Sequence, residues 1–209
     1  QDITISTYEY TGVLLNKVVQ VQSAYDDRKA LAHSMGYTLM RGMEVTLAAL
    51  FQSFSQIVGT LGADLDDAII RRANQYLEDG GFYEDASWLF SPGMKASLLG
   101  NDKFTSRDFV STPAIERAKL PQILGHDAFV SNLLRSPASG QREGALLHRS
   151  AIILIRQIQP TATAQYLIRQ NADAMLMYDL YAAVEAEQPA EAPGSESLGD
   201  TGAVLIRGG

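Results

Sequence analysis

Large apolar side chains recur at steps of four and three residues through one long polar segment of the chain. They are Leu31, Met35, Leu39, Met43, Leu47, Leu50 and Phe54. This spacing keeps one face of a helix apolar for about eight turns. The pattern therefore predicts a helix over about 24–56, roughly 50 Å long.

Sequence signals mark both ends of this predicted helix. Residues 23–26 form a capping box, and Gly59 and Gly62 end the run. The alternatives are a coiled coil and two helices broken at Gly36 or Gly42. Because the apolar positions do not keep a heptad, we expect one long helix, with room to bend, rather than a coiled coil.

Alternating apolar and polar positions predict extended segments elsewhere. They cover 1–8, 13–21, 87–90, 123–130, 164–170, 174–181 and 202–208. The last of these reads as a buried strand, and the two before it read as antiparallel partners. The segment 188–202 has the composition of an exposed loop, because Pro, Ala, Gly, Ser and Glu dominate it.

Helix signals also recur outside the long segment. A helix is predicted over 64–77, closed by two glycines at 80–81. Ser91 followed by Pro92 predicts the start of another helix, and residues 112–113 predict a further short one. The run 145–147 is expected to lead into a helix that ends near residue 157.

Composition narrows the classes of function. The 209 residues are 46% hydrophobic and 20% charged, which is ordinary for a globular chain. The formal net charge of −7 disfavours broad binding to a phosphate backbone. The chain has no cysteine, so thiolate chemistry and disulfides are excluded. No apolar run approaches the roughly 20 residues that span a bilayer.

Ser91 is the strongest candidate nucleophile, because it stands at a predicted strand-to-helix turn with glycine two residues later. Two neighbours argue against this hypothesis. Leu89 stands where a nucleophile elbow has glycine, and Pro92 lacks the N–H that would build half of an oxyanion hole. A serine cap before a proline-started helix explains the same residues without catalysis.

The remaining residues suggest no chemistry. His33, His126 and His148 lie far apart in the sequence and have no partner at metal-ligand spacing. The chain contains no glycine-rich phosphate loop. We therefore expect no catalytic residue, no cofactor and no metal site.

Several short motifs follow the long helix in a fixed order. They are 88–94 with 98–99, 104–109, 123–125 with 130–134, 145–151 and 172–182. The ordered set resembles the major capsid proteins of tailed bacteriophages (Caudoviricetes), which have the Hong-Kong-phage-type fold. The likeness spans nearly the whole chain, although Ala182 stands where many relatives have glycine.

The resemblance implies an α+β fold with a peripheral (P) domain around a long spine helix, and an axial (A) domain. Residues 1–57 would hold the end of the extended loop (E-loop) and the P-domain with the spine helix. Residues 58–158 would form the A-domain, 159–182 the P-domain strands, and 183–209 a loop and strand returning to the A-domain sheet. The N-terminal arm and most of the E-loop are expected to be absent from this chain.

The same resemblance implies a non-enzymatic shell subunit that self-assembles into pentamers and hexamers of an icosahedral head around double-stranded DNA. Decoration, scaffolding and portal proteins are further implied partners, with no membrane and no sequence-specific contact to DNA. The implied location is the virion, assembled in the host cytoplasm. The alternatives are an encapsulin-like cargo compartment and, from another class, a serine hydrolase that uses Ser91.

Glycine within the long helix suggests one mechanical role. Gly36 and Gly42 each cost about 1 kcal/mol in a helix interior relative to alanine. We therefore expect them to be hinge positions at which the spine helix bends during shell expansion, unless they are surface or close-packing positions.

Overall fold

The structure is a computed structural model that describes residues 2–22, 27–101, 122–186 and 202–209. Its contacts divide the chain into two compact units. Unit 1 comprises residues 1–46 and 154–184, and unit 2 comprises residues 47–153 and 185–209. Each unit is described by itself.

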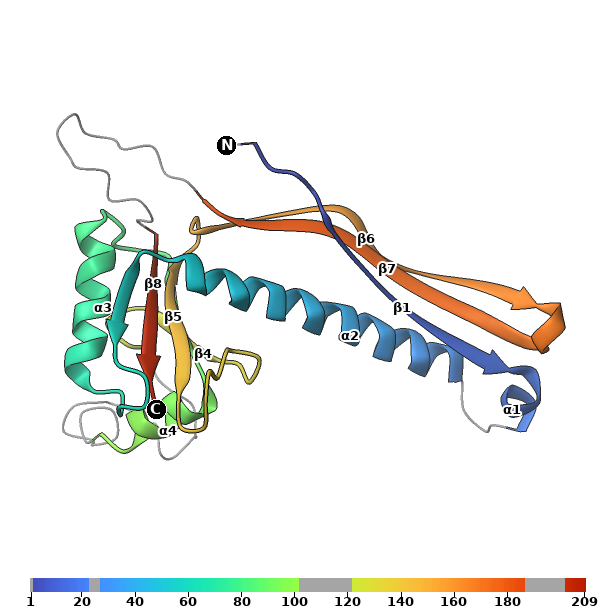
Figure 1. Cartoon of the computed structure of the whole chain (residues 1–209), viewed down its shortest axis with the longest axis horizontal. Coiled ribbons are helices and arrows are strands. Elements are labelled where there is room, and N and C mark those ends of the chain that lie inside the picture. Colours follow the sequence, from blue (N-terminus) through green and yellow to red (C-terminus); the bar gives the residue numbers. More distant parts are fainter. Residues whose placement is uncertain (1, 23–26, 102–121, 187–201) are drawn as a thin grey trace. The chain divides into compact units, whose positions relative to one another are not determined.

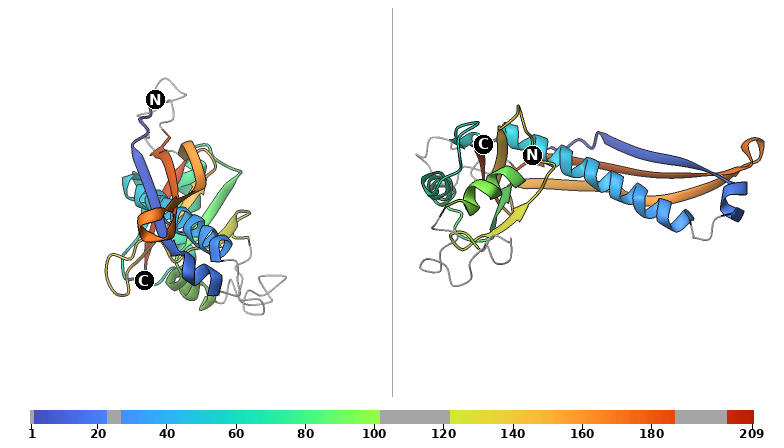
Figure 2. Two further views of the ribbon diagram at one scale, coloured as in Figure 1. Left: turned by 90° about the vertical axis from the view of Figure 1, so that its right-hand side faces the viewer. Right: turned by 90° about the horizontal axis from the view of Figure 1, so that it is seen from below.

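Unit 1 is a three-stranded sheet with one long helix on one face (Figures 1 and 2). Its strands are β1 (Thr7–Asn16), β6 (Ile152–Leu167) and β7 (Ala172–Glu185), in the order β1-β7-β6. β1 pairs antiparallel with β7 along its whole length. The helix is α2 (Asp27–Ala49), and the short α1 (Lys17–Gln22) and the 3₁₀ turn η2 (Ile168–Gln170) complete the unit.

The core of unit 1 is small, and methionine supplies most of it. Met35 and Leu39 of α2 pack against Met175 and Met177 of β7. All four are buried, because they lie on the facing sides of the helix and the sheet. The sheet thus has one covered face, and the side chains on its other face alternate outward.

Unit 2 is built on a five-stranded mixed sheet in the order β2-β8-β5-β3-β4. The strands are β2 (Gln56–Gly59), β3 (Ala86–Phe90), β4 (Asp127–Val130), β5 (Arg142–His148) and β8 (Ala203–Gly208). Helices α3 (Asp67–Asp79) and α4 (Pro92–Leu99) contribute to one core cluster. The 3₁₀ turn η1 (Leu50–Ser53) contributes Phe51 to a second.

The larger core of unit 2 centres on Trp88, which is fully buried. Its ring stacks on Phe90 with centroids 5.7 Å apart. Its indole Nε1 donates a hydrogen bond of 2.9 Å to the backbone oxygen of Ile123. The indole therefore ties the segment before β4 to the centre of the sheet.

Several local expectations are confirmed. α3 begins after Asp66, whose side chain accepts from the Ile69 N–H at 2.9 Å, and it ends at Gly80. Gly81 follows with φ +85°, the left-handed conformation that favours glycine. β7 and β8 lie where alternation predicted strands, and β8 is almost wholly buried.

Other boundaries were wrong. The long helix ends at Ala49, and the chain continues through η1 into β2, so it is shorter than the predicted 24–56. It also runs unbroken through both glycines, which excludes the two-helix alternative. The expected extended piece 13–21 is strand only to Asn16 and then becomes α1.

The expected helix ending near residue 157 was also wrong. Its sequence forms the end of β5, a turn, and the start of β6. Leu146 packs into one core cluster and Ala145 into the other, so both faces of β5 are covered and its apolar residues run continuously. A continuous apolar run does not distinguish a buried strand from a buried helix. The capping box at 23–26, the predicted helix start at 112–113 and nearly all of the loop 188–202 lie outside the described residues.

Replacing Trp88 with phenylalanine tests the centre of unit 2. The change should lower the free energy of unfolding by about 2 kcal/mol, because it opens a cavity and removes the indole hydrogen bond to the Ile123 oxygen, which keeps only the His126 N–H as a donor. Urea denaturation followed by far-ultraviolet circular dichroism measures it. Tyr83→Phe is the control, since Tyr83 is 69% exposed. Equal stability of the two variants would contradict the assigned role of Trp88.

Candidate functional site

The face of the unit 1 sheet that points away from α2 carries large exposed side chains. Tyr8, Tyr10 and Leu14 of β1 are 54%, 67% and 60% exposed. In register with them on β7 are Leu180, Tyr178 and Ala174. The Tyr8 ring lies 5.8 Å from Tyr10 and 6.2 Å from Tyr178 between centroids, so the three tyrosines form one cluster. We call this surface the outer face.

The charged residues of the unit 1 strands point to the opposite side. Within 7–16, 154–167 and 172–184 they are Glu9, Arg156, Asp173 and Asp179. Each contacts α2 itself or a residue that does, as the following contacts establish. The outer face of these described strands is therefore uncharged, although the whole chain carries a net charge of −7.

Two of these charges form a buried pair beneath α2. Asp179 is 1% exposed, and its carboxylate lies 3.1 Å from the Arg156 guanidinium. The same guanidinium reaches the sulfur of Met43 on α2 at 2.9 Å. A buried carboxylate without such a partner would be strongly destabilising, so Arg156 is required on this side of the sheet.

Glu9 lies beside this pair, directly across the strands from Asp179. Tyr181 donates a hydrogen bond of 3.0 Å to its carboxylate, and the Tyr181 hydroxyl also lies 3.2 Å from Thr46 Oγ1 on α2. Burial raises the pKa of Tyr181 above its ordinary value, and the negative charges of Glu9 and Asp179 act in the same direction. The hydrogen bond with Thr46 opposes this shift.

The two glycines of α2 have different surroundings. A Cβ at Gly42 would collide with the Glu9 carboxylate, whereas a Cβ at Gly36 would meet only the Met177 sulfur at 3.8 Å, an ordinary contact. Close packing against the Glu9 carboxylate, which would have to shift, is therefore a reason for glycine at position 42. It does not explain glycine at position 36.

A third set of charges closes the far end of unit 1. Asp173, buried at the start of β7, accepts from Lys17 Nζ at 3.0 Å and also pairs with Arg28 near the start of α2. The Lys17 N–H donates to the Asn171 oxygen at 3.0 Å. These contacts join α1, α2 and the β6–β7 turn at one point.

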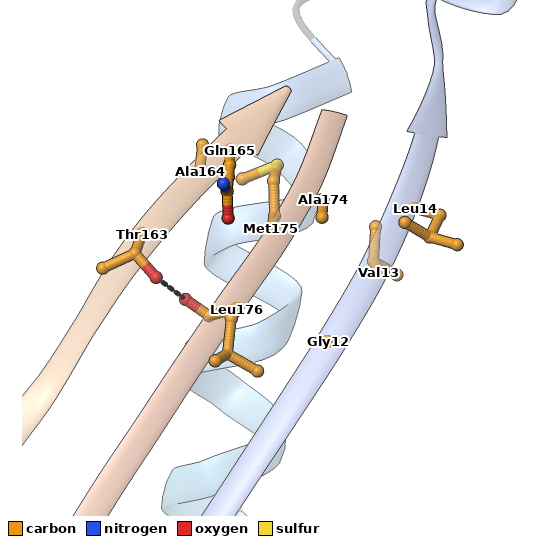
Figure 3. A pocket seen from close by; sticks show the side chains of 9 residues that line it. All are labelled: Gly12, Val13, Leu14, Thr163, Ala164, Gln165, Ala174, Met175 and Leu176. Carbon is orange, nitrogen blue, oxygen red and sulfur yellow. Dashed lines mark hydrogen bonds between the residues drawn. The ribbon is translucent and has the colours of Figure 1, made fainter. Parts of the chain in front are cut away.

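A hollow of about 450 Å³ opens on the outer face. Its lining comes from all three strands: Gly12, Val13, Leu14, Thr163, Ala164, Gln165, Ala174, Met175 and Leu176. Figure 3 shows these residues with α2 behind the strands. Thr163 Oγ1 donates to the Leu176 oxygen at 3.2 Å across the hollow's floor. Like the outer face around it, the hollow is uncharged.

The sequence-predicted chemical candidates lie elsewhere and apart. Ser91 is 2% exposed, and its hydroxyl accepts from the Met94 N–H at 3.3 Å as the cap of α4. His33 is exposed on α2, and His148 pairs with Ser150 at 2.7 Å. Among the described residues, no three His, Asp or Glu side chains gather as metal ligands. None of the helices in that part of the chain is long and apolar enough to cross a membrane.

Sequence reasoning found both glycines but missed the outer face. The alternation of Tyr8, Tyr10 and Leu14 was a usable signal, because it continues the period-two pattern of the first residues. Their neighbours on β7 lie more than 150 residues away in sequence, so the surface appears only when the two strands pair.

Two matched helix variants test the role of Gly42. Gly36→Ala should raise the free energy of unfolding by about 1 kcal/mol through helix propensity alone. Gly42→Ala should give no gain or a loss, because the new methyl group displaces Glu9 from its hydrogen bond with Tyr181. Urea denaturation measures both variants. Equal stabilisation of the two would contradict the packing role.

The Tyr181 hydroxyl predicts an alkaline effect on stability. A pKa raised in the folded state means that folding favours the neutral phenol, so its contribution is complete below pH 10 and declines as the pH rises through the raised pKa. The loss of stability above pH 10 should therefore be steeper for the wild type than for Tyr181→Phe, in thermal melts recorded from pH 8 to 11. Equal loss of thermal stability with pH in the wild type and in Tyr181→Phe would contradict the burial of the Tyr181 hydroxyl.

Comparisons with known proteins identify the fold. No family model matches the sequence, and no curated protein matches it. A structure from Mycobacterium phage Che8 matches with a TM-score of 0.80 and 20% identity, over 99% of this chain and 72% of that chain. The capsid of cyanophage P-SCSP1u matches with a TM-score of 0.75 and 15% identity, over 98% of this chain and 72% of that chain.

The holo-SrpI encapsulin complex from Synechococcus elongatus PCC 7942 is also similar, with a TM-score of 0.67 and 12% identity, over 96% of this chain and 72% of that chain. At these identities the likeness concerns the fold. It confirms the fold class expected from the sequence motifs: this chain has the Hong-Kong-phage-type fold of bacteriophage capsid proteins.

Proposed function

We propose that this protein is a non-enzymatic major capsid (shell) subunit of a tailed bacteriophage. Copies of it assemble into pentamers and hexamers of an icosahedral head that encloses double-stranded DNA. The fold supports this proposal, because the similar structures include phage capsids and heads.

The uncharged outer face is the observation that carries the proposal. Each copy has a net charge of −7, so contacts between copies face electrostatic repulsion unless charges are kept away from them. The unit 1 strands place their four charged side chains toward α2 and leave tyrosine, leucine and small residues outward. Tyrosine is enriched at protein interfaces, because its ring is apolar and its hydroxyl can still bond.

The two units take the roles of the two capsid domains in this proposal. Unit 1 is the peripheral domain, with α2 as its spine helix, and unit 2 is the axial domain. The domain boundaries expected from the sequence lie at 57, 158 and 182, and those of the two compact units lie at 46, 153 and 184. The C-terminal segment joins the unit 2 sheet as β8, as an axial-domain strand would.

The spine helix carries the proposed hinge positions. Gly36 is the stronger hinge candidate. Its surroundings leave room for a side chain, so packing does not require glycine there. Gly42 is held close to Glu9, so bending at that position would also disturb the contact with β1. In this proposal both positions respond when the shell expands.

An encapsulin-like cargo compartment is the second candidate, because an encapsulin complex shares the fold. The two functions differ in what the shell holds: nucleic acid in a head, and a cargo protein in a compartment. The serine hydrolase has no support from the geometry, since the Ser91 hydroxyl is buried and caps a helix. Decoration, scaffolding and portal proteins are proposed partners, the virion is the proposed location, and assembly takes place in the host cytoplasm.

Electron microscopy of the full-length protein purified from expressing cells tests the proposal. We expect closed shells of uniform diameter, and nuclease-protected double-stranded DNA inside particles isolated from the native phage. Protein cargo in place of DNA would favour the compartment. Monomers or small oligomers under all conditions, with any scaffolding protein supplied, would overturn both shell functions.

A charge on the outer face provides the matched variant. Tyr10→Asp should reduce the yield of shells at least tenfold, because assembly would then have to bury a charged carboxylate in the interface. Tyr83→Asp places the same charge on an equally exposed tyrosine of unit 2 and serves as the control. Both variants should keep the circular dichroism spectrum of the wild type. Normal assembly of Tyr10→Asp would show that the outer face is not a contact surface.

A further inference from the structure

We propose that Ile168, at the tip of the β6–β7 hairpin, inserts into the outer-face hollow of a second copy of this chain. The inference rests on the proposed shell function and names one specific contact between subunits. It joins two features of unit 1: the exposed tip and the uncharged hollow.

Ile168 is the most exposed large hydrophobic residue in the described part of the chain, at 83%. Single exposed apolar residues are common and need no explanation by themselves. Ile168 is unusual because it lies in the short turn η2 at the end of two long strands, where an aliphatic side chain projects beyond the sheet.

The turn that carries Ile168 is braced by several contacts. The Asn171 N–H donates to the Ile168 oxygen at 3.3 Å, and Asn171 is left-handed with φ 45°. Tyr166 donates to Asn171 Oδ1 at 2.9 Å, and the Lys17 ammonium lies 5.5 Å from the centre of the Tyr166 ring. A turn fixed in this way loses little conformational entropy on docking, so Ile168 is pre-organised as a knob.

The hollow has the complementary chemistry. Gly12 and Ala174 add no large side chain to its lining, while Leu14 of β1 and Leu176 of the central strand β7 supply larger apolar side chains (Figure 3). Its volume of about 450 Å³ accommodates a branched aliphatic side chain together with part of its turn. Since its lining is uncharged, the hollow suits the isoleucine side chain itself, and Arg169, the next residue of η2, has to stay at the rim of the contact.

The knob and the hollow of one chain cannot meet each other. Gly12 pairs with Leu176, which lies five residues beyond Asn171 on β7. That separation is about 16 Å along the strand, and Ile168 is 83% exposed, so it does not fill the hollow of its own sheet. The occupant we propose is a second copy, in a head-to-tail contact of two different surfaces, which generates a closed ring when the rotation between copies closes.

Paired cysteines test the contact directly, because the chain has no cysteine of its own. The double variant Gly12→Cys with Ile168→Cys should form a ladder of disulfide-linked oligomers on a non-reducing gel after oxidation. A disulfide within one chain is excluded, because the two Cα atoms lie well beyond the roughly 7 Å limit. Each single variant should give no ladder.

Two results of this experiment would overturn the contact. Efficient dimer formation by Ile168→Cys alone would show that the tips meet one another instead. The absence of any cross-link in assembled shells of the double variant would show that the tip lies elsewhere.

Assembly measurements on two further variants separate this inference from the proposed function. Ile168→Asp should weaken association roughly 10- to 100-fold, the equivalent of losing one buried aliphatic side chain. Gly12→Leu should weaken it as well by filling the hollow, and its Cβ fits, since the nearest atoms are at 3.5 Å. Tyr83→Asp is again the control.

The outcomes are distinct. If the wild type forms shells and both variants assemble equally well, only the knob-in-hollow contact fails. If the wild type remains monomeric and the cysteine pair forms no cross-link, the contact and the shell function fail together.

Discussion

A three-stranded sheet with one helix can bury only one of its faces, and this constraint shapes unit 1. The helix side holds a small methionine-rich core and the four charged side chains within 7–16, 154–167 and 172–184. Buried charge is tolerated there only because each carboxylate has a partner: Arg156 for Asp179, Lys17 and Arg28 for Asp173, and Tyr181 for Glu9. The opposite face is thereby left free of charge.

This arrangement links stability to association. A monomer that exposes tyrosines and leucines over a sheet face is kept soluble by its net charge of −7. In a shell, the same face would meet another copy and the negative charge would lie outside the contact. Unit 2 differs, because both faces of its central strands β5 and β8 are covered and its core is centred on Trp88.

The sequence predicted what is local and missed what depends on distant pairing. Ser91 and Pro92 correctly predicted the start of α4, because an N-cap and a first-turn proline act within one turn of helix. The prediction of a helix at β5 was wrong, since its continuous apolar run reflects core clusters on both faces, built from residues that lie far away in the chain. The sequence pointed to Gly42 as a special position in the helix. It could not show that the Glu9 carboxylate approaches this glycine closely. The outer face and its hollow required the pairing of β1 with β7.

Hydroxyl-radical footprinting of the tyrosines, before and after assembly, tests the central claim most directly. If the outer face is the contact between copies, Tyr8, Tyr10 and Tyr178 should lose most of their reactivity on assembly. The buried Tyr181 should be unreactive in both states, which calibrates the measurement. Unchanged reactivity of Tyr8 and Tyr10 in assembled shells would contradict the account.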